Sequence, residues 1–300
     1  MTDPATLLFS ESPAPLGQYV RALCARNRLS GQVQIPRLQA VLSGVQTTPE
    51  KVAAYASVCG FHGDPSVLPL TYPHILAFPL HMELMLHKDF PLPLMGLVHI
   101  RNRISRRRPV RVTEQLTVHC RLGDSRATDK GVEFDIFTEI SSNGESVWTS
   151  VSTNFCRRPA VPTSVNRCAA PAELRHFDRT ESWFLPSDLG RRYARVSGDS
   201  NPIHLWPLSA RLFGFRRHIA HGMWSKARIA ASLADTTGDA PCTLITEFRQ
   251  PVFLPAEVIL HVSPLAGDND GYAFELRNRN GDRVHVRGEI SREPNAQESP

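Results

Sequence analysis

The sequence predicts an α+β chain made of two similar domains. The segment from Tyr55 to Gly60 reads Tyr-Ala-Ser-Val-Cys-Gly, and the segment from Tyr193 to Gly198 reads Tyr-Ala-Arg-Val-Ser-Gly, so four of the six positions are identical. In each half this segment is followed by an apolar run and then by strand-like runs separated by polar turns. The repeated order of parts indicates an internal duplication, and a length of 300 residues suits two domains.

The first half is expected to begin with a strand over residues 38–45. A helix should follow, because Thr48 can cap its start and Pro49 suits its first turn. Its buried face would consist of Val52, Tyr55 and Cys59. The later parts are an apolar run over 72–86 that could end in a helix, an alternating basic segment over 98–108, and strands over 116–122, 132–140 and 146–155.

The second half repeats this order. A helix with Leu189, Tyr193 and Val196 on one face should end at Gly198, since glycine is a common helix stop. The remaining expected parts are a helical run over 218–233 and strand-like runs over 244–252, 257–264, 272–278 and 283–291.

These parts divide the chain into five segments. We expect an N-terminal extension over 1–31, a first domain over 32–158, a linker over 159–176, a second domain over 177–292 and a tail over 293–300. The linker assignment rests on its prolines and its few large apolar residues. The extension could form a short helix with Val20 and Leu23 inward, and no function is assigned to it.

Composition excludes several classes of protein. An apolar fraction of 41% is ordinary for a globular chain, and a net charge of +5 suits an anionic ligand without requiring one. The basic residues are scattered and form no nucleic-acid-binding motif, so no nucleic acid partner is expected.

Cysteines and targeting signals point to the cytoplasm. No Cys-x-x-Cys pair is present, so a zinc site is not expected. The N-terminus lacks the pattern of a signal peptide, and prolines interrupt the most apolar region, residues 66–100, so no membrane span is expected there. A reducing cytoplasm is therefore the expected location.

The densest chemistry lies in residues 193–204. Asp199 can accept a proton, and His204 can accept or donate one near neutral pH. Pro202 stiffens the chain between them, and Asn201 before it is biased toward an extended or turn conformation. We therefore expect Asp199 and His204 to form an acid/base pair on a stiff loop just past a helix end.

The order Asp-x-Asn-Pro-x-His over 199–204, preceded by Tyr-Ala-x-x-Ser-Gly, resembles the signature of the MaoC-like dehydratases and (R)-specific enoyl-CoA hydratases. The resemblance continues in Ala220-His221-Gly222-Met223 and in residues 248–258, and it covers roughly residues 180–290. It implies a tandem (double) hotdog fold, in which each half is a curved antiparallel sheet around a central helix. The active site would lie at the junction of the halves, and two chains could pair as a homodimer.

The resemblance also implies a reaction, the interconversion of 2-enoyl and (3R)-3-hydroxyacyl thioesters by addition or loss of water. Asp199 and His204 would hold the water and act as base and acid, with Asp199 the preferred base. The backbone N–H of Gly222, at a helix start, would stabilise the thioester oxygen. No metal or redox cofactor is required.

Four further residues are expected to bind the substrate, which would be an acyl-CoA or an acyl carrier protein thioester. Asn201 would orient the loop or His204, and His221 belongs to the motif at the start of the central helix. Arg216 and Arg217 could hold the phosphates of the carrier. The family often carries a serine on the central helix, and both Ser225 and Ser232 are available.

The first copy departs from the signature. Phe61 stands where the second copy has Asp199, and the spacing of His62 and Asp64 matches no known pair, so this copy should do no chemistry. Most of its apolar residues would form core, and a minority would line a tunnel for an acyl tail. The apolar residues concerned, core and tunnel candidates together, are Leu68, Leu70, Ile75, Leu76, Phe78, Leu80 and Met82.

Two alternative functions remain open from the sequence. A hotdog thioesterase would share the fold but would usually place a carboxylate on the central helix, and residues 222–234 contain no Asp or Glu. A non-catalytic acyl-CoA-binding accessory subunit is conceivable because half of the repeat has already lost the Asp and His pair.

Overall fold

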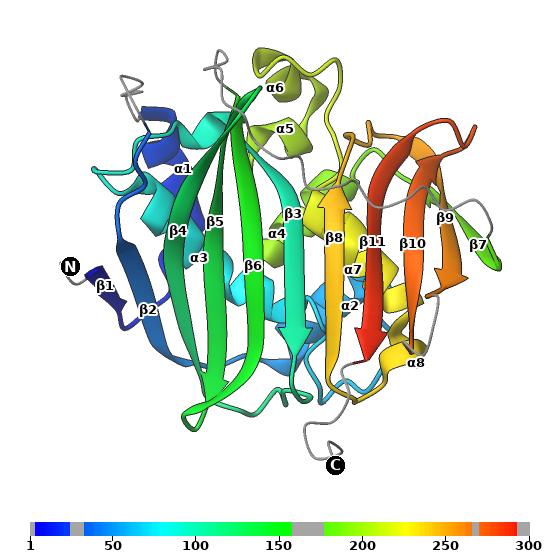
Figure 1. Cartoon of the computed structure of the whole chain (residues 1–300), viewed down its shortest axis with the longest axis horizontal. Helices are drawn as coiled ribbons and strands as arrows, with labels where there is room; N and C mark the ends of the chain where they lie inside the picture. Colours follow the sequence, from blue (N-terminus) through cyan, green and yellow to red (C-terminus); the bar gives the residue numbers. More distant parts are fainter. Residues whose placement is uncertain (1–3, 25–32, 158–176, 266–269, 293–300) are drawn as a thin grey trace.

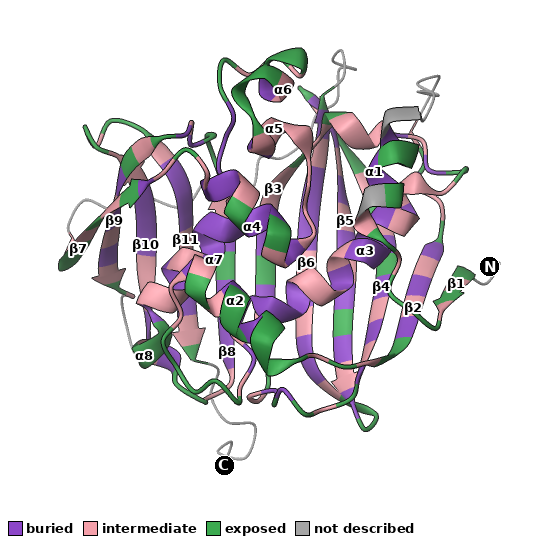
Figure 2. Cartoon of the chain, turned by 180° about the vertical axis from the view of Figure 1, so that it is seen from behind, coloured by how far each residue is buried: buried purple, intermediate pink, exposed green. Residues whose placement is uncertain are grey.

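A computed structural model of the chain describes residues 4–24, 33–157, 177–265 and 270–292. The expected linker over 159–176 and tail over 293–300 lie outside these residues, as do parts of the extension and the turn after residue 265. The described residues form one sheet of 11 strands, and the helices lie across one of its faces (Figures 1 and 2).

The two halves of the sheet have the same internal order. Read from the outer side inward, the first half runs β2-β4-β5-β6-β3 and the second runs β7-β9-β10-β11-β8. The strands of the first half are β2 (Leu38–Val45), β3 (Leu97–Arg106), β4 (Leu116–Thr128), β5 (Gly131–Ser142) and β6 (Glu145–Arg157). Those of the second are β7 (Arg179–Leu185), β8 (Cys242–Phe248), β9 (Ala256–Pro264), β10 (Gly271–Asn278) and β11 (Val284–Arg292).

The halves meet where β3 pairs with β8 in antiparallel register, from Arg101 opposite Glu247 to Arg106 opposite Cys242. Because β3 and β8 occupy equivalent positions in the two halves, this pairing makes one continuous sheet. A single cluster of buried apolar side chains then runs between the sheet and the helices through both halves. The expected tandem hotdog architecture is confirmed.

The helices repeat in the same way (Figure 2). The first half contains α2 (Pro49–Cys59) and α3 (Tyr72–Leu86), and the second contains α4 (Leu189–Ser197) and α7 (Gly222–Ser232). Both α2 and α4 end in a left-handed glycine, Gly60 at φ 79° and Gly198 at φ 77°, a conformation that glycine adopts without strain. The equivalent tyrosines Tyr55 and Tyr193 are buried between these helices, with ring centroids 6.1 Å apart.

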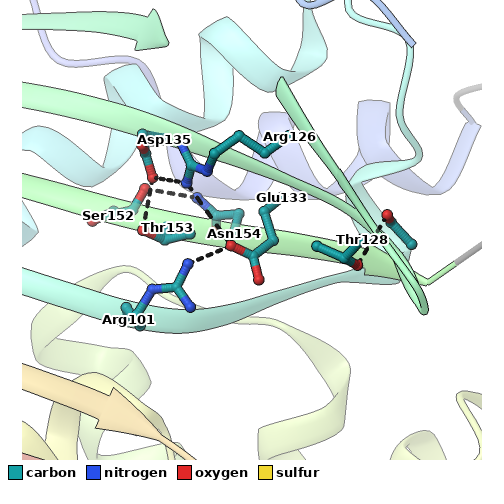
Figure 3. A network of polar contacts seen from close by, with 9 residues as sticks. Arg101, Arg126, Thr128, Glu133, Asp135, Ser152, Thr153 and Asn154 are labelled. Atoms are coloured by element: carbon teal, nitrogen blue, oxygen red, sulfur yellow. Dashed lines mark hydrogen bonds and ion pairs between the residues drawn. The ribbon is translucent and has the colours of Figure 1, made fainter. Parts of the chain in front are cut away.

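Alternation along β5 separates two environments. Phe134 and Ile136 are buried toward the helices, while Glu133 and Asp135 point to the other face. There the two carboxylates pair with Arg101 of β3 and Arg126 of β4, so the network joins strands across the first half (Figure 3). Such pairs near the surface add little stability individually, but they help to fix the register of the strands.

Several expected elements differ from the structure. Strand β4 extends through the polar residues 123–128 because it pairs there with β5 as a hairpin, with Ser125 opposite Phe134. Two strands were not expected: β7, which is polar and lies at one edge, and β1 (Ala5–Phe9), which pairs in parallel with β2. The described helices include none that is long and apolar enough to cross a membrane.

The expected orientation of the N-terminal helix was wrong. Helix α1 (Pro15–Cys24) leaves Val20 55% exposed and buries Tyr19 instead, while the Leu23 side chain lies outside the described residues. The reason is polar docking, since Gln18 Nε2 donates to Pro79 O at 2.8 Å and Arg21 pairs with Glu83 at 2.7 Å. These contacts with α3, not an apolar stripe, determine which face turns inward.

A close backbone contact positions α5 (Pro202–Leu205) against α4. A Cβ atom on Gly190 would lie 1.9 Å from the carbonyl oxygen of His204. We predict that Gly190→Ala displaces α5 and lowers the free energy of unfolding by about 1–3 kcal/mol, the usual effect of overpacking. Urea denaturation measures this. Gly63→Ala is the control, since no atom lies within 4 Å of the added methyl, and an equal loss in both variants would contradict the prediction.

Candidate active site

A cavity of about 430 Å³ is lined by residues from both halves of the chain. The second half contributes Asp199, His204 and His221, and the first half contributes residues of α3, β3 and β6. This volume lies within the range of about 300–1,000 Å³ that is common for pockets binding small molecules. The cavity therefore joins the two halves at the place where the sequence predicts the chemistry.

Asp199 follows the glycine that ends α4, so its side chain leaves the helix and enters the cavity. Its Oδ1 atom accepts hydrogen bonds from the hydroxyl of Tyr19 at 2.6 Å and from the backbone N–H of Asn201 at 3.2 Å. Its Oδ2 atom lies 3.8 Å from Nε2 of His221. One carboxylate oxygen is thus held by two donors, and the other faces the histidines.

His204 lies on the short helix α5. The expectation from the sequence, that it lies on a loop, was wrong. Asn201 caps this helix, because its Oδ1 atom accepts the N–H of Ile203 at 3.3 Å. The His204 Nδ1–H donates to the carbonyl of Ile219 at 2.8 Å. This bond fixes the tautomer, so in the neutral ring Nε2 carries a free lone pair.

His221 caps the N-terminus of the central helix α7 and stacks on His204 with ring centroids 3.7 Å apart. Its Nε2–H donates to the backbone carbonyl of Asp199 at 3.0 Å, which ties the loop to the helix. Gly222 follows, and a side chain there would press on the Phe248 ring, whose Cδ1 lies 3.0 Å from a built Cβ. The amides at this helix start have no carbonyl partner within the helix and are positively polarised.

The surroundings set the charge of each group. Burial would raise the pKa of Asp199, but His221, His204 and the Tyr19 hydroxyl together hold it below its ordinary value. Burial, aided by His221, lowers the pKa of His204 to about 3. Burial also lowers the pKa of His221, against the opposing effect of Asp199. Near neutral pH the site therefore contains one carboxylate beside two neutral imidazoles.

One donor atom from each of Asp199, His204 and His221 lies within 4.8 Å of the others, which is close enough to hold a metal ion. Two of the ring nitrogens are already committed to backbone carbonyls, His204 Nδ1 and His221 Nε2. The lone pairs that remain are those of the Asp199 carboxylate, His204 Nε2 and His221 Nδ1, and each can accept a proton.

Known proteins share this chain's sequence and fold. A model of the MaoC like domain matches residues 168–269. The 3-hydroxyacyl-thioester dehydratase X of Mycobacterium tuberculosis is 35% identical over 253 residues, which cover 82% of this chain and 86% of that protein. This chain belongs to the MaoC-like dehydratase family.

Two further comparisons agree with this assignment. A crystal structure of HtdX of M. tuberculosis matches with a TM-score of 0.72 and 32% identity, covering 84% of this chain and 98% of that one. A mitochondrial 3-hydroxyacyl-[acyl-carrier-protein] dehydratase of Arabidopsis thaliana is 34% identical over 117 residues, which cover 38% of this chain and 70% of that protein. As a MaoC-like dehydratase, the chain is a hydro-lyase.

The other predicted substrate-binding residues of this dehydratase have different surroundings. Arg216 and Arg217 are exposed, and they lie between Phe215 and Ile219, which line the cavity. The Arg216 guanidinium stacks 4.3 Å from the ring centroid of Phe253. Both arginines are therefore near the cavity but do not line it.

The structure separates the two serines of the central helix. Ser225 is buried and lines the cavity, whereas Ser232 donates to Glu181 at 2.6 Å. In the first copy, Phe61 stacks on Tyr55 with centroids 6.5 Å apart, so its position is filled by packing. His62 and Asp64 lie on an exposed turn, as expected.

Sequence reasoning missed Tyr19, which the expected N-terminal extension supplies to the second half of the chain. Its hydroxyl donates to Asp199, and burial followed by the nearby carboxylate raises the pKa of Tyr19 far above its ordinary value. Tyr19 therefore remains a donor at any working pH. A single tyrosine in a segment with no other signal gives no indication that it lies beside a residue 180 positions later.

We predict that Tyr19→Phe raises the pKa of Asp199, because the variant loses a donor that stabilises the carboxylate. A hydrogen bond to a charged group contributes about 1.5–3 kcal/mol, which corresponds to about 1–2 pH units. The acid limb of the kcat/KM profile for dehydration should move to higher pH by that amount. Tyr272→Phe is the control, since Tyr272 does not line the cavity. Equal profiles for both variants and the wild type would contradict a role for Tyr19.

Proposed function

We propose that the chain interconverts 2-enoyl and (3R)-3-hydroxyacyl thioesters by acid/base addition or loss of water. The observation that carries this proposal is the convergence of Asp199 and His204 on one cavity beside the N-terminus of α7. The name of the M. tuberculosis relative, a 3-hydroxyacyl-thioester dehydratase, supports the substrate class. The (3R) configuration rests on the resemblance of the Asp-x-Asn-Pro-x-His segment to the (R)-specific hydratases.

The proposed base is Asp199, with His204 as its partner. A water that donates a hydrogen bond of ordinary length to each of two acceptors can span about 4.5 Å. Asp199 and His204 each offer one donor atom within 4.8 Å of the other, so one water is proposed to bridge them. In the hydration direction, the water oxygen bonds to C3 as one of its protons passes to the base. The same proton can then be delivered to the α-carbon, so no other reactant is needed.

The thioester oxygen must be stabilised while enolate charge builds on it. The backbone N–H of Gly222 is the proposed donor, since it belongs to the unpaired first turn of α7. The absence of a side chain allows close approach to this amide. Asn201 and His221 would act by holding the catalytic segment, through the cap of α5 and the bond to the Asp199 carbonyl.

We further propose a division of labour between the halves, with residues 32–158 forming the acyl-pocket half and residues 177–292 the catalytic half. Ile75, Phe78 and Met82 of α3 line the cavity, in support of an acyl-binding role. The thioesterase alternative is less favoured because α7 contains no Asp or Glu. Pairing of two chains as a homodimer remains a prediction that light scattering in solution can measure.

The proposed reaction is tested with a series of 2-enoyl-CoA substrates. Hydration removes the conjugated double bond, so the ultraviolet absorbance of the enoyl thioester should fall, and chiral analysis should find the (3R) product. Asp199→Asn and His204→Gln should each lower kcat by about 10²–10⁴, the usual contribution of an acid/base group. His62→Gln, on an exposed turn, is the control. Full activity of Asp199→Asn, or thiol release without hydration, would contradict the mechanism, and tight binding without turnover would favour the accessory subunit.

Carrier recognition has its own test. Replacing Arg216 and Arg217 together with alanine should raise KM for CoA thioesters about tenfold while kcat stays nearly constant, because phosphate contacts act equally in the ground and transition states. The effect should shrink at high salt. Arg279→Ala is the control, since this side chain is 75% exposed and pairs with Glu257. An unchanged KM in the double variant would remove these arginines from the binding site.

A further inference from the structure

The first-half side of the cavity is unexpectedly polar for a pocket that holds an acyl tail. His74 and His81 of α3, His99 of β3, and Ser152 and Asn154 of β6 all line it. We call these five residues the histidine wall. They lie next to the apolar residues of α3 that also face the cavity. A saturated alkyl chain would offer no hydrogen-bond partner to the two ring nitrogens of this wall that find none in the described part of the chain, His74 Nδ1 and His99 Nε2.

The three imidazoles pack against one another. His74 meets His81 edge to face with centroids 5.4 Å apart, and it stacks on His99 at 6.0 Å. His81 is satisfied, because its Nε2 atom bonds to Thr138 Oγ1 at 2.7 Å. In contrast, His74 Nδ1 and His99 Nε2 are buried atoms that find no hydrogen-bond partner among the described residues. The whole His74 residue is buried, with 6% of its surface exposed. Buried ring nitrogens without partners are unfavourable, and because both atoms are shielded, a ligand oxygen would reach them when the rings turn toward the cavity.

A fixed polar network supports the wall from behind. The buried Lys226 of α7 donates to Asn102 O at 2.8 Å, to Asn102 Oδ1 at 2.6 Å and to Leu244 O at 3.0 Å, which uses all three of its donors. Asn102 Nδ2 in turn donates to Ser152 Oγ at 3.0 Å. Ser152 thus receives a hydrogen bond from the network, and its own hydroxyl proton can be donated into the cavity.

The charge of the wall indicates which ligand it suits. Burial lowers the pKa of His81 to about 4 and that of His99 to about 3, so both rings are neutral near pH 7. The only arginine among the described lining residues, Arg249, pairs with Glu247 at 3.0 Å. A carboxylate would therefore meet no free cation. Neutral imidazoles and a serine hydroxyl offer both donors and acceptors, which match a neutral oxygen.

We propose that the histidine wall binds a second oxygen on the acyl chain, a hydroxyl or keto group beyond carbon 4. This inference rests on the proposed function, and it narrows the substrate to thioesters whose acyl chain is itself oxygenated. His99 lies beside Phe248, with ring centroids 5.2 Å apart, and Phe248 packs against Gly222 at the start of α7. The wall is thus adjacent to the catalytic helix, so the second oxygen belongs on the chain near the reacting carbons and not at a distant tail.

The test compares 2-enoyl-CoA substrates of equal chain length, with and without a hydroxyl or keto group at successive positions beyond carbon 4. At one or two positions, kcat/KM should be at least about tenfold higher for the oxygenated chain, because a site built to bind an oxygen discriminates against chains that lack it. The ratio should fall toward one in His74→Phe and His99→Leu. His62→Phe is the matched control and should keep the wild-type ratio, since His62 is exposed and does not line the cavity.

Ser152→Ala is the second test variant in case the histidine variants do not fold, because it removes only one oxygen atom. It should also lower the ratio of kcat/KM for oxygenated over plain chains. Equal kcat/KM values for plain and oxygenated chains at every position would overturn the proposed role of the histidine wall. They would leave the proposed hydration reaction intact. A preference for a carboxylate on the chain would overturn it as well. If the wild type hydrates no thioester, the proposed function fails. The binding role of the histidine wall is then tested separately, by calorimetric measurement of Kd for saturated acyl-CoAs with and without the second oxygen. Equal Kd values for plain and oxygenated chains would then refute it.

Discussion

The antiparallel pairing of β3 with β8 is the interaction on which the rest of the molecule depends. It joins two five-stranded units edge to edge, so neither unit exposes this strand edge to other chains. It also sets α3 of one half and α7 of the other over the same sheet (Figure 2). The cavity exists because of this arrangement, since its walls come from both helices and from β3 and β6. A separate second half would contain the carboxylate and the imidazole but only part of the pocket.

Within that frame, the catalytic segment is held by short-range bonds to backbone atoms. Ile219 fixes the His204 ring, and His221 holds the carbonyl of Asp199. Both bonds leave His204 Nε2 and the Asp199 Oδ2 atom available for the proposed proton transfer. Tyr19 completes this shell from the opposite end of the chain, and together with His221 and His204 it holds the pKa of Asp199 below its ordinary value despite burial. Preorganisation of this kind is what allows two ordinary side chains to act at fixed separation.

The two halves repeat the same order of strands and helices but differ at the ends of the equivalent helices α2 and α4. Phe61 stands at the position of Asp199, and its ring packs on Tyr55 there. The cavity surface of the first half carries polar residues, and behind them the buried Lys226 of the second half donates to Asn102 of β3. The half without the Asp and His pair thus supplies one wall of the shared cavity.

The sequence by itself determined the repeat, most of the strands, the capped helix beginning at Pro49 and the pairing of Asp199 with His204, because each leaves a local pattern of spacing or turn chemistry. It did not predict β1, β7 or the inward face of α1, since edge strands and polar docking carry no periodic signal. The position of Tyr19 and the meeting of His74, His81 and His99 were decided only by the tertiary structure. These contacts join distant segments, and their strength comes from burial, which no local stretch of sequence records.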